Sequence, residues 1–185
     1  LRQSIYDAIW AHHNRDQRNL SLNALHNNLK LKPIIEVDNH HAIRNALNLS
    51  KEFKMNFIIK GSGDEYLSLD RLGVAQFILP VNFPDAYDVN DPYESLGLSL
   101  EKMKHWELAP ANAALLASKD VEFAFTAFGL KNTEDFIDRV KICIKHGLSE
   151  ETALRALTSV PAKMLGISNS YGALKKGMKA NFIVC

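Results

Sequence analysis

The chain has 185 residues, of which 46% are hydrophobic and 23% charged, and its formal net charge is +1. This length can bury one sizeable core, and the near-neutral charge argues against nucleic acid or an anionic membrane as the main partner. No apolar run approaches the ~20 residues of a membrane span, and the opening LRQSIYDAIW lacks the pattern of a signal peptide. The two cysteines, Cys143 and Cys185, predict neither a disulfide framework nor a metal cluster.

Strand and helix patterns alternate along the chain. Short runs of β-branched and aromatic residues predict four strands, at 34–37, 56–59, 75–79 and 121–126. Helical periodicity around them predicts helices at 1–12, 20–31, 42–53, 65–72, 93–106, 109–118 and 136–146. This alternation is typical of right-handed β-α-β units on a parallel sheet.

Two of the helical patterns carry clear apolar stripes. In 42–53 the stripe contains Ile43, Ala46, Leu47 and Phe53. In 93–106 we expect a buried edge made of Leu96, Leu100 and Met103. The proline-punctuated segment PVNFPDAYDVNDP at 80–92 is predicted to be a loop.

The C-terminal segment has the clearest local signals for where helices begin and end. Ser149 followed by two acids predicts a helix start, with an apolar stripe at Leu154, Leu157, Met164 and Leu165. Pro161 is expected to stop this helix, because proline lacks an amide hydrogen. A short turn at 162–165 then ends at Gly166, and 180–185 is expected to be a β-like run.

This C-terminal pattern also resembles a known family. GLSEETALRALTSVPAKMLGI followed by YGALKKGMKANFIV resembles the end of a metal-dependent amidohydrolase of the imidazolonepropionase-like branch. KPIIEVDNHHAIRNALNLSKEFKMNFIIKGSGDEY resembles the fifth strand, its helix and the sixth strand of such a barrel. Asn181 departs from the aspartate that the family usually has at that position.

The resemblance implies an α/β fold, the second half of a TIM-type (β/α)8 barrel with about four βα units and parallel strands. Residues 1–166 would form this partial barrel, and 167–185 would be a return segment toward a small β-sandwich. A complete barrel is about twice as long, so we expect a C-terminal piece of a longer protein. Its partner would be the missing N-terminal barrel half or a second copy of the chain. The resemblance further implies a bacterial parent that acts on a small molecule and is exported or periplasmic.

The same resemblance allows three metal-ligand positions to be checked. The histidine of the fifth strand is replaced by Glu36 or Val37, depending on a one-residue shift, and that of the sixth by Lys60 or Gly61. Phe128 stands where the eighth strand would carry the aspartate that moves the proton. Lysine is a cation at neutral pH and opposes a bound metal, and phenylalanine offers no donor. We therefore expect no metal and no catalytic residue in this chain, although the parent would bind zinc or another divalent ion.

Several polar residues can be interpreted either as part of a site or as structural residues. A hypothetical ion pair between Glu36 and Lys60 would replace the metal's charge. His40 is a candidate polar site residue, or else it caps the next helix together with His41, the two rings pointing to opposite sides of an extended chain. Asp64 and Glu65 are expected to cap a helix.

Two functions from different classes follow. The first is a C-terminal part of an amidohydrolase-like hydrolase that cleaves a carbon–nitrogen bond in an amide, a cyclic amide or a small peptide. This part would be inactive when isolated. The second is a non-catalytic pseudo-enzyme or scaffold that packs on a catalytic partner or barrel half.

Overall fold

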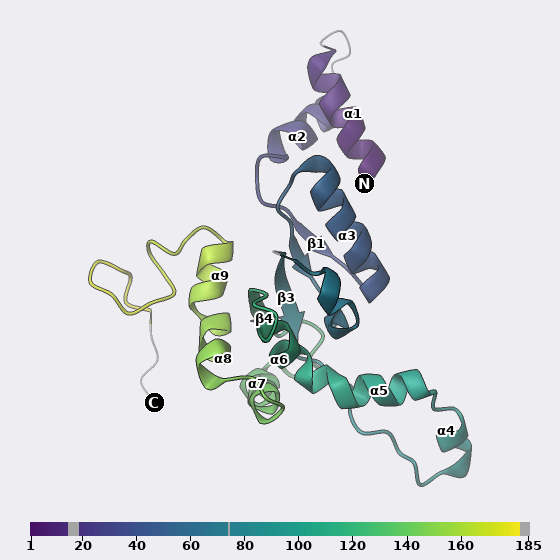
Figure 1. The fold of residues 1–185 in the computed structure, drawn as a ribbon. Helices are drawn as coiled ribbons and strands as arrows, with labels where there is room; N and C mark the ends of the chain where they lie inside the picture. Colours follow the sequence, from purple (N-terminus) through teal and green to yellow (C-terminus); the bar gives the residue numbers. More distant parts are fainter. Residues whose placement is uncertain (15–18, 74, 182–185) are drawn as a thin grey trace.

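The computed structural model describes residues 1–14, 19–73 and 75–181, and its fold is shown in Figure 1. Four strands form one sheet in the order β1-β2-β3-β4, and every neighbouring pair is parallel. The strands are β1 (Ile34–Glu36), β2 (Ile58–Lys60), β3 (Gln76–Pro80) and β4 (Phe123–Thr126). All four predicted strands are confirmed, and so is the α/β class.

Helices precede, connect and follow the strands. The α-helices are α1 (Arg2–His13), α2 (Leu20–Asn28), α3 (His40–Phe53), α4 (Pro92–Leu96), α5 (Leu100–Leu108), α6 (Asn112–Ala117), α7 (Phe136–Lys145), α8 (Glu150–Leu157) and α9 (Ser159–Met164). Three 3-10 turns are η1 (Glu65–Arg71), η2 (Ala109–Ala111) and η3 (Thr133–Asp135). Within the described ranges, no helix has the length and apolar character needed to cross a membrane.

The sheet buries side chains on both faces because alternate residues of a strand point to opposite sides. One face packs against α3, α6 and α7 through residues that include Ile59, Phe77, Leu116 and Cys143. The other face packs against α9, where Val160 and Met164 cover Ile58 and Ala124. In Figure 1, α3 and α9 accordingly lie on opposite sides of the sheet. Cys143 is a free cysteine buried in this core, whereas Cys185 lies outside the described residues.

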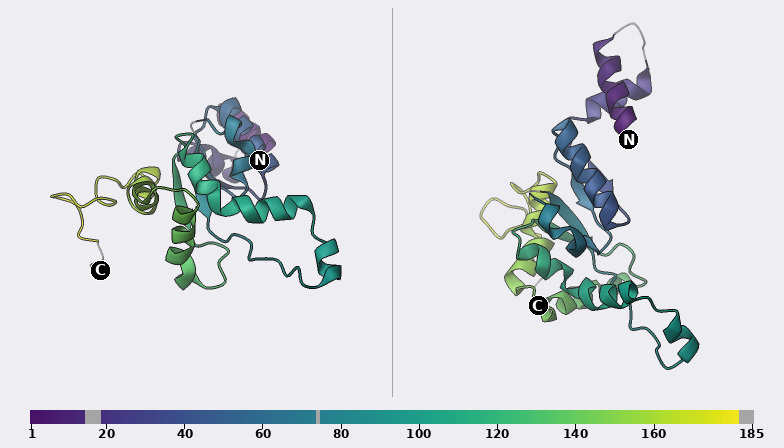
Figure 2. Two further views of the ribbon diagram at one scale, coloured as in Figure 1. Left: turned by 60° about the horizontal axis from the view of Figure 1, so that its bottom comes forward. Right: turned by 45° about the vertical axis from the view of Figure 1, so that its right-hand side comes forward.

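The segment after β3 differs from its prediction. It forms two helices, α4 and α5, instead of one at 93–106. Leu96, Leu100 and Met103 are 84%, 63% and 44% exposed, so the predicted buried edge is wrong. Figures 1 and 2 show this arm projecting away from the sheet, so its apolar stripe has little of this chain to pack against.

The C-terminal helices confirm one prediction and correct another. Ser149 Oγ accepts a hydrogen bond from Thr152 N at 3.1 Å, as a helix cap should. The expected break is present: α8 ends at Leu157, whose carbonyl cannot accept a hydrogen bond from Pro161, and a second short helix follows. The position of Pro161 differs from the prediction, because it lies in the first turn of α9, where an amide hydrogen has no partner within the helix.

The buried face of α8 and α9 agrees with the predicted stripe only in part. Ala153 and Ala156 are buried, whereas Leu154 and Leu165 are each 62% exposed. Of the predicted stripe, Met164 is buried and Leu157 packs against the core beside these two alanines. At the end of the chain Ala180 and Asn181 are not in a strand, and the remainder of the predicted run 180–185 lies beyond the described part.

Candidate functional site

The carboxyl ends of parallel strands meet at one edge of the sheet, and three of the predicted positions lie there. Glu36 is the last residue of β1 and pairs in register with Lys60, the last residue of β2. Phe128 follows the end of β4 by two residues. The sheet therefore brings side chains from three separate strands to one place.

The Lys60 ammonium is the centre of this cluster. Its Nζ lies 2.7 Å from Glu36 Oε1 and 3.0 Å from the centroid of the Phe128 ring. The side chain of Lys60 is 17% exposed, whereas that of Glu36 is 62% exposed. The hypothesised ion pair is thus present, and the face of the aromatic ring adds a second favourable contact for the cation. We call Glu36, Lys60 and Phe128 the strand-end cluster.

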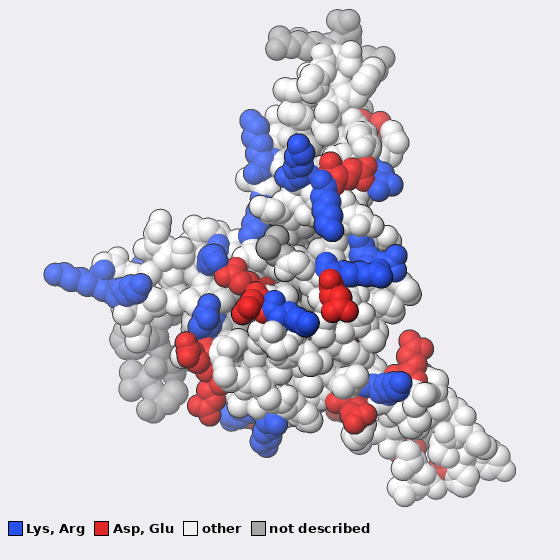
Figure 3. Space-filling model, viewed as in Figure 1, with Lys and Arg blue, Asp and Glu red and all other residues white. Residues whose placement is uncertain are grey.

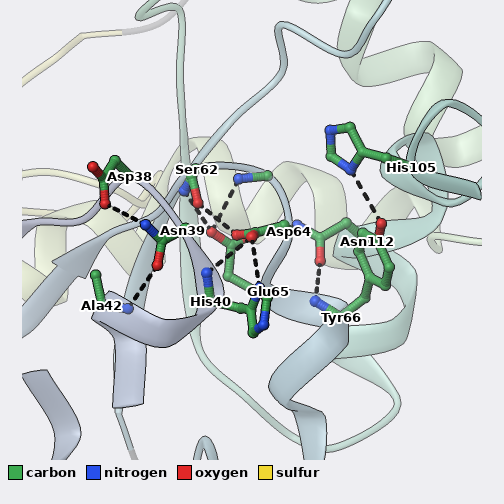
Figure 4. Close-up of polar contacts among 11 residues, drawn as sticks. Asp38, Asn39, His40, Ala42, Ser62, Asp64, Glu65, Tyr66, His105 and Asn112 are labelled. Carbon is green, nitrogen blue, oxygen red and sulfur yellow. Dashed lines mark hydrogen bonds and ion pairs between the residues drawn. The ribbon is translucent and has the colours of Figure 1, made fainter. Parts of the chain in front are cut away.

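His40 is held at a different place. It is the first residue of α3, its backbone N donates to Asp64 Oδ2 at 2.9 Å, and its Nδ1 lies 3.3 Å from the same oxygen. Asp64 Oδ1 also accepts from Ser62 Oγ at 2.5 Å. Within the described residues, the polar contacts of His40 therefore go to the loop after β2. Figure 4 shows this arrangement.

The prediction that His40 and His41 point to opposite sides is wrong. Both lie in the first turn of α3, where neighbouring residues are about 100° apart instead of opposed as in a strand. Their ring centroids are 3.9 Å apart. The cap expected of them is made instead by Asn39, whose Oδ1 accepts a hydrogen bond from Ala42 N at 2.9 Å.

A fully buried carboxylate, Glu65, was not identified as such from the sequence. Its Oε1 accepts from Ser62 N at 2.8 Å and from Gly63 N at 3.1 Å, and its Oε2 accepts from Asn112 Nδ2 at 2.5 Å. Burial raises the pKa of Glu65 above its usual range, and the hydrogen bonds from Gly63 and Asn112 oppose that rise. Glu65 thus fastens the loop after β2 to α6, and the cap expected from Asp64 and Glu65 is not formed.

The neighbouring residues explain how this carboxylate fits. Gly61 leaves the space for it, since a Cβ at this position would lie 2.6 Å from Glu65 Cδ. Asn112 Oδ1 accepts from Tyr66 N at 2.9 Å, and the Tyr66 hydroxyl lies 3.1 Å from Nδ1 of His105 on α5. The sequence signal for this arrangement is Glu65 itself, four residues beyond Gly61 at the end of a buried strand.

Comparisons with known proteins support one family. The family model described as "Amidohydrolase family" matches residues 91–185. A crystal structure of an amidohydrolase from Thermotoga maritima MSB8 is similar with a TM-score of 0.74 at 18% identity, covering 97% of this chain and 47% of that one. A crystal structure of an uncharacterized protein gives a TM-score of 0.54 at 16% identity, covering 80% of this chain and 36% of that one. No curated protein matches the chain.

These structural matches define the architecture. The chain spans about half the length of the solved amidohydrolase and superposes on it almost completely. Four parallel strands with their helices, matched to half of such a chain, make up a partial TIM-type barrel. The predicted fold is therefore confirmed.

Proposed function

The chain belongs to the amidohydrolase family, and from this premise we propose that it forms the C-terminal half of a hydrolase barrel that acts on a carbon–nitrogen bond of a small molecule. The strand ends that this half contributes carry an internal cation instead of a metal. The Lys60 ammonium between the Glu36 carboxylate and the Phe128 ring is the observation that carries the proposal.

The side chains at the three strand ends do not fit a divalent ion. A metal ligand needs a free lone pair, which a protonated lysine and a phenyl ring both lack. Glu36 is the one donor of the three, and its carboxylate already holds the ammonium. Among the described residues, no group of three or more His, Cys, Asp or Glu side chains is arranged to hold a metal. Two cations at this place would also repel each other strongly.

The two halves of the barrel would then contribute different parts of the active site. A metal and the group that moves a proton would have to come from residues outside this chain. The strand-end cluster would then form part of the wall of the substrate pocket. Phe128 favours a second candidate function, a non-catalytic scaffold, because a phenyl ring cannot act as a general base.

Metal analysis of the purified protein tests the metal-free cluster. We expect less than about 0.1 zinc or other divalent ion per chain by mass spectrometry after dialysis, as for a site without donors. The comparison variant is Glu36→His/Lys60→His/Phe128→Asp, which restores the ligand types that the family resemblance implies. This variant should bind zinc more tightly than the natural chain. Stoichiometric metal in the natural chain that is lost in Glu36→Gln would contradict the proposal.

An activity assay separates the two candidate functions. The chain is combined with the N-terminal half of its parent, and hydrolysis of a panel of amides, lactams and dipeptides is measured. A hydrolase predicts turnover that requires both halves and is absent from either half alone. Absence of turnover in a well-folded complex would favour the scaffold.

A further inference from the structure

A groove outside the strand-end cluster is lined by cations from three separate elements. It has a volume of about 570 Å³, and residues of η1 form much of its lining. Arg44 comes from α3, Arg71 ends η1, and Lys119 follows α6. The groove exists because η1 packs against both α3 and α6. In Figure 3, basic side chains lie over the part of the face that carries α3, with acidic side chains between them.

The three cations have no acidic partner in the described part of the chain. The ion pairs there use other residues. The one acidic side chain in the lining is Asp70, so the groove has an excess of positive charge. Like charges gathered around one hollow raise its potential and attract an anion.

Polar side chains complete the lining. His40 and His41 lie at the groove with their ring centroids 3.9 Å apart, and Tyr66 lines it as well. Imidazole N–H groups can donate hydrogen bonds to an anionic oxygen, whereas the Tyr66 hydroxyl already lies 3.1 Å from His105 Nδ1. The groove therefore combines a net positive charge with additional donors, which an apolar ligand would leave unpaired.

We propose that this groove, lined by Arg44, Arg71 and Lys119, binds a small molecule that carries two or more phosphate groups. Guanidinium groups form two parallel hydrogen bonds with a phosphate, which favours phosphate over a single point-charge interaction. Three cations exceed what one phosphate needs, and the volume lies in the range of pockets for whole small molecules. The site is separate from the strand-end cluster and does not depend on the proposed hydrolysis.

Calorimetric titration with inorganic tripolyphosphate at low salt tests the proposal. The test variant is Arg44→Gln/Arg71→Gln/Lys119→Gln. The control variant, Lys104→Gln/Lys145→Gln/Lys176→Gln, removes the same charge from exposed positions outside the groove. Each groove cation should contribute roughly tenfold in affinity, so the test variant should bind at least ~100-fold more weakly. The control should change binding less than about threefold. Circular dichroism confirms that both variants are folded.

Three outcomes would overturn the proposal. The first is the absence of saturable tripolyphosphate binding to the natural chain. The second is an equal loss of affinity in the test and control variants, which would mean general charge attraction. The third is that citrate binds as tightly as tripolyphosphate, which would mean that the groove does not select phosphate over other anions. Shifts of the His40 and His41 ring signals in NMR during the titration would support it, and a titration that leaves both unmoved would count against it.

Discussion

Substitution of Gly61 by alanine should strongly destabilise the chain through Glu65. The new Cβ would lie 2.6 Å from Glu65 Cδ and even closer to Oε1, and Gly61 is itself buried. The carboxylate would have to move away from Ser62 N, Gly63 N and Asn112 Nδ2, its three donors.

The size of the effect follows from two contributions. Overpacking of a buried site costs about 1–3 kcal/mol. Loss of one hydrogen bond to a charged group costs a further ~1.5–3 kcal/mol. We therefore expect Gly61→Ala to lower the free energy of unfolding by about 3–5 kcal/mol, a large part of the ~5–15 kcal/mol typical of a domain. Urea unfolding followed by circular dichroism measures it.

A double-mutant cycle makes this prediction specific. Glu65→Ala leaves one buried and two partly buried donors without their acceptor and should cost about 3 kcal/mol by itself. In that background the space beside Gly61 is empty, so Gly61→Ala should cost less than about 1 kcal/mol. The two changes should thus be coupled by at least ~2 kcal/mol. Additivity within about 0.5 kcal/mol would refute the reasoning, because it would mean that the methyl group and the carboxylate do not compete for one space.

Three further predictions concern charge and capping. Burial raises the pKa of Glu65 from its ordinary 4.5, so the folded chain keeps this proton to higher pH than the unfolded chain does. The stability it contributes is complete below pH 4.5 and is lost as the pH rises through the folded pKa. The natural chain should therefore lose stability relative to Glu65→Gln as the pH rises above 4.5 in urea unfolding, and parallel curves would contradict this. Ser149→Ala should cost about 1 kcal/mol in thermal unfolding, since Ser149 caps α8, whereas an unchanged melting temperature would show that the cap contributes nothing. Lys60→Met should cost about 1 kcal/mol or less, because its partner Glu36 is 62% exposed, and a loss above ~3 kcal/mol would indicate a buried pair.

The buried face of a helix was predictable from the sequence where its whole apolar side packs against the core. The stripe of α3 was found because Ile43, Ala46 and Leu47 are all buried against the sheet. The same periodicity was misleading for Leu96 and Leu100, because an apolar stripe does not show whether the rest of the chain supplies a surface to cover it. Periodicity therefore located the helices better than it located the core.

The strand-end cluster was predictable in part for a topological reason. Parallel strands place the last residues of neighbouring strands side by side, so Glu36 and Lys60 could be paired from the sequence. The contact between Lys60 and Phe128 was not foreseen, since it depends on how the chain turns after β4. Glu65 was read as a cap because an acid before a helical segment usually is one, and only its burial distinguishes the two roles.

The two adjacent acids after β2 serve two neighbouring elements. Asp64 binds the first residue of α3, while Glu65 turns inward and binds Asn112 at the start of α6. A loop held on both sides by carboxylates has little freedom to move, and it begins directly after Lys60. The ammonium therefore stands on a backbone that these two anchors hold in place. This explains how the strand-end cluster can keep its geometry although Glu36 itself is mostly exposed.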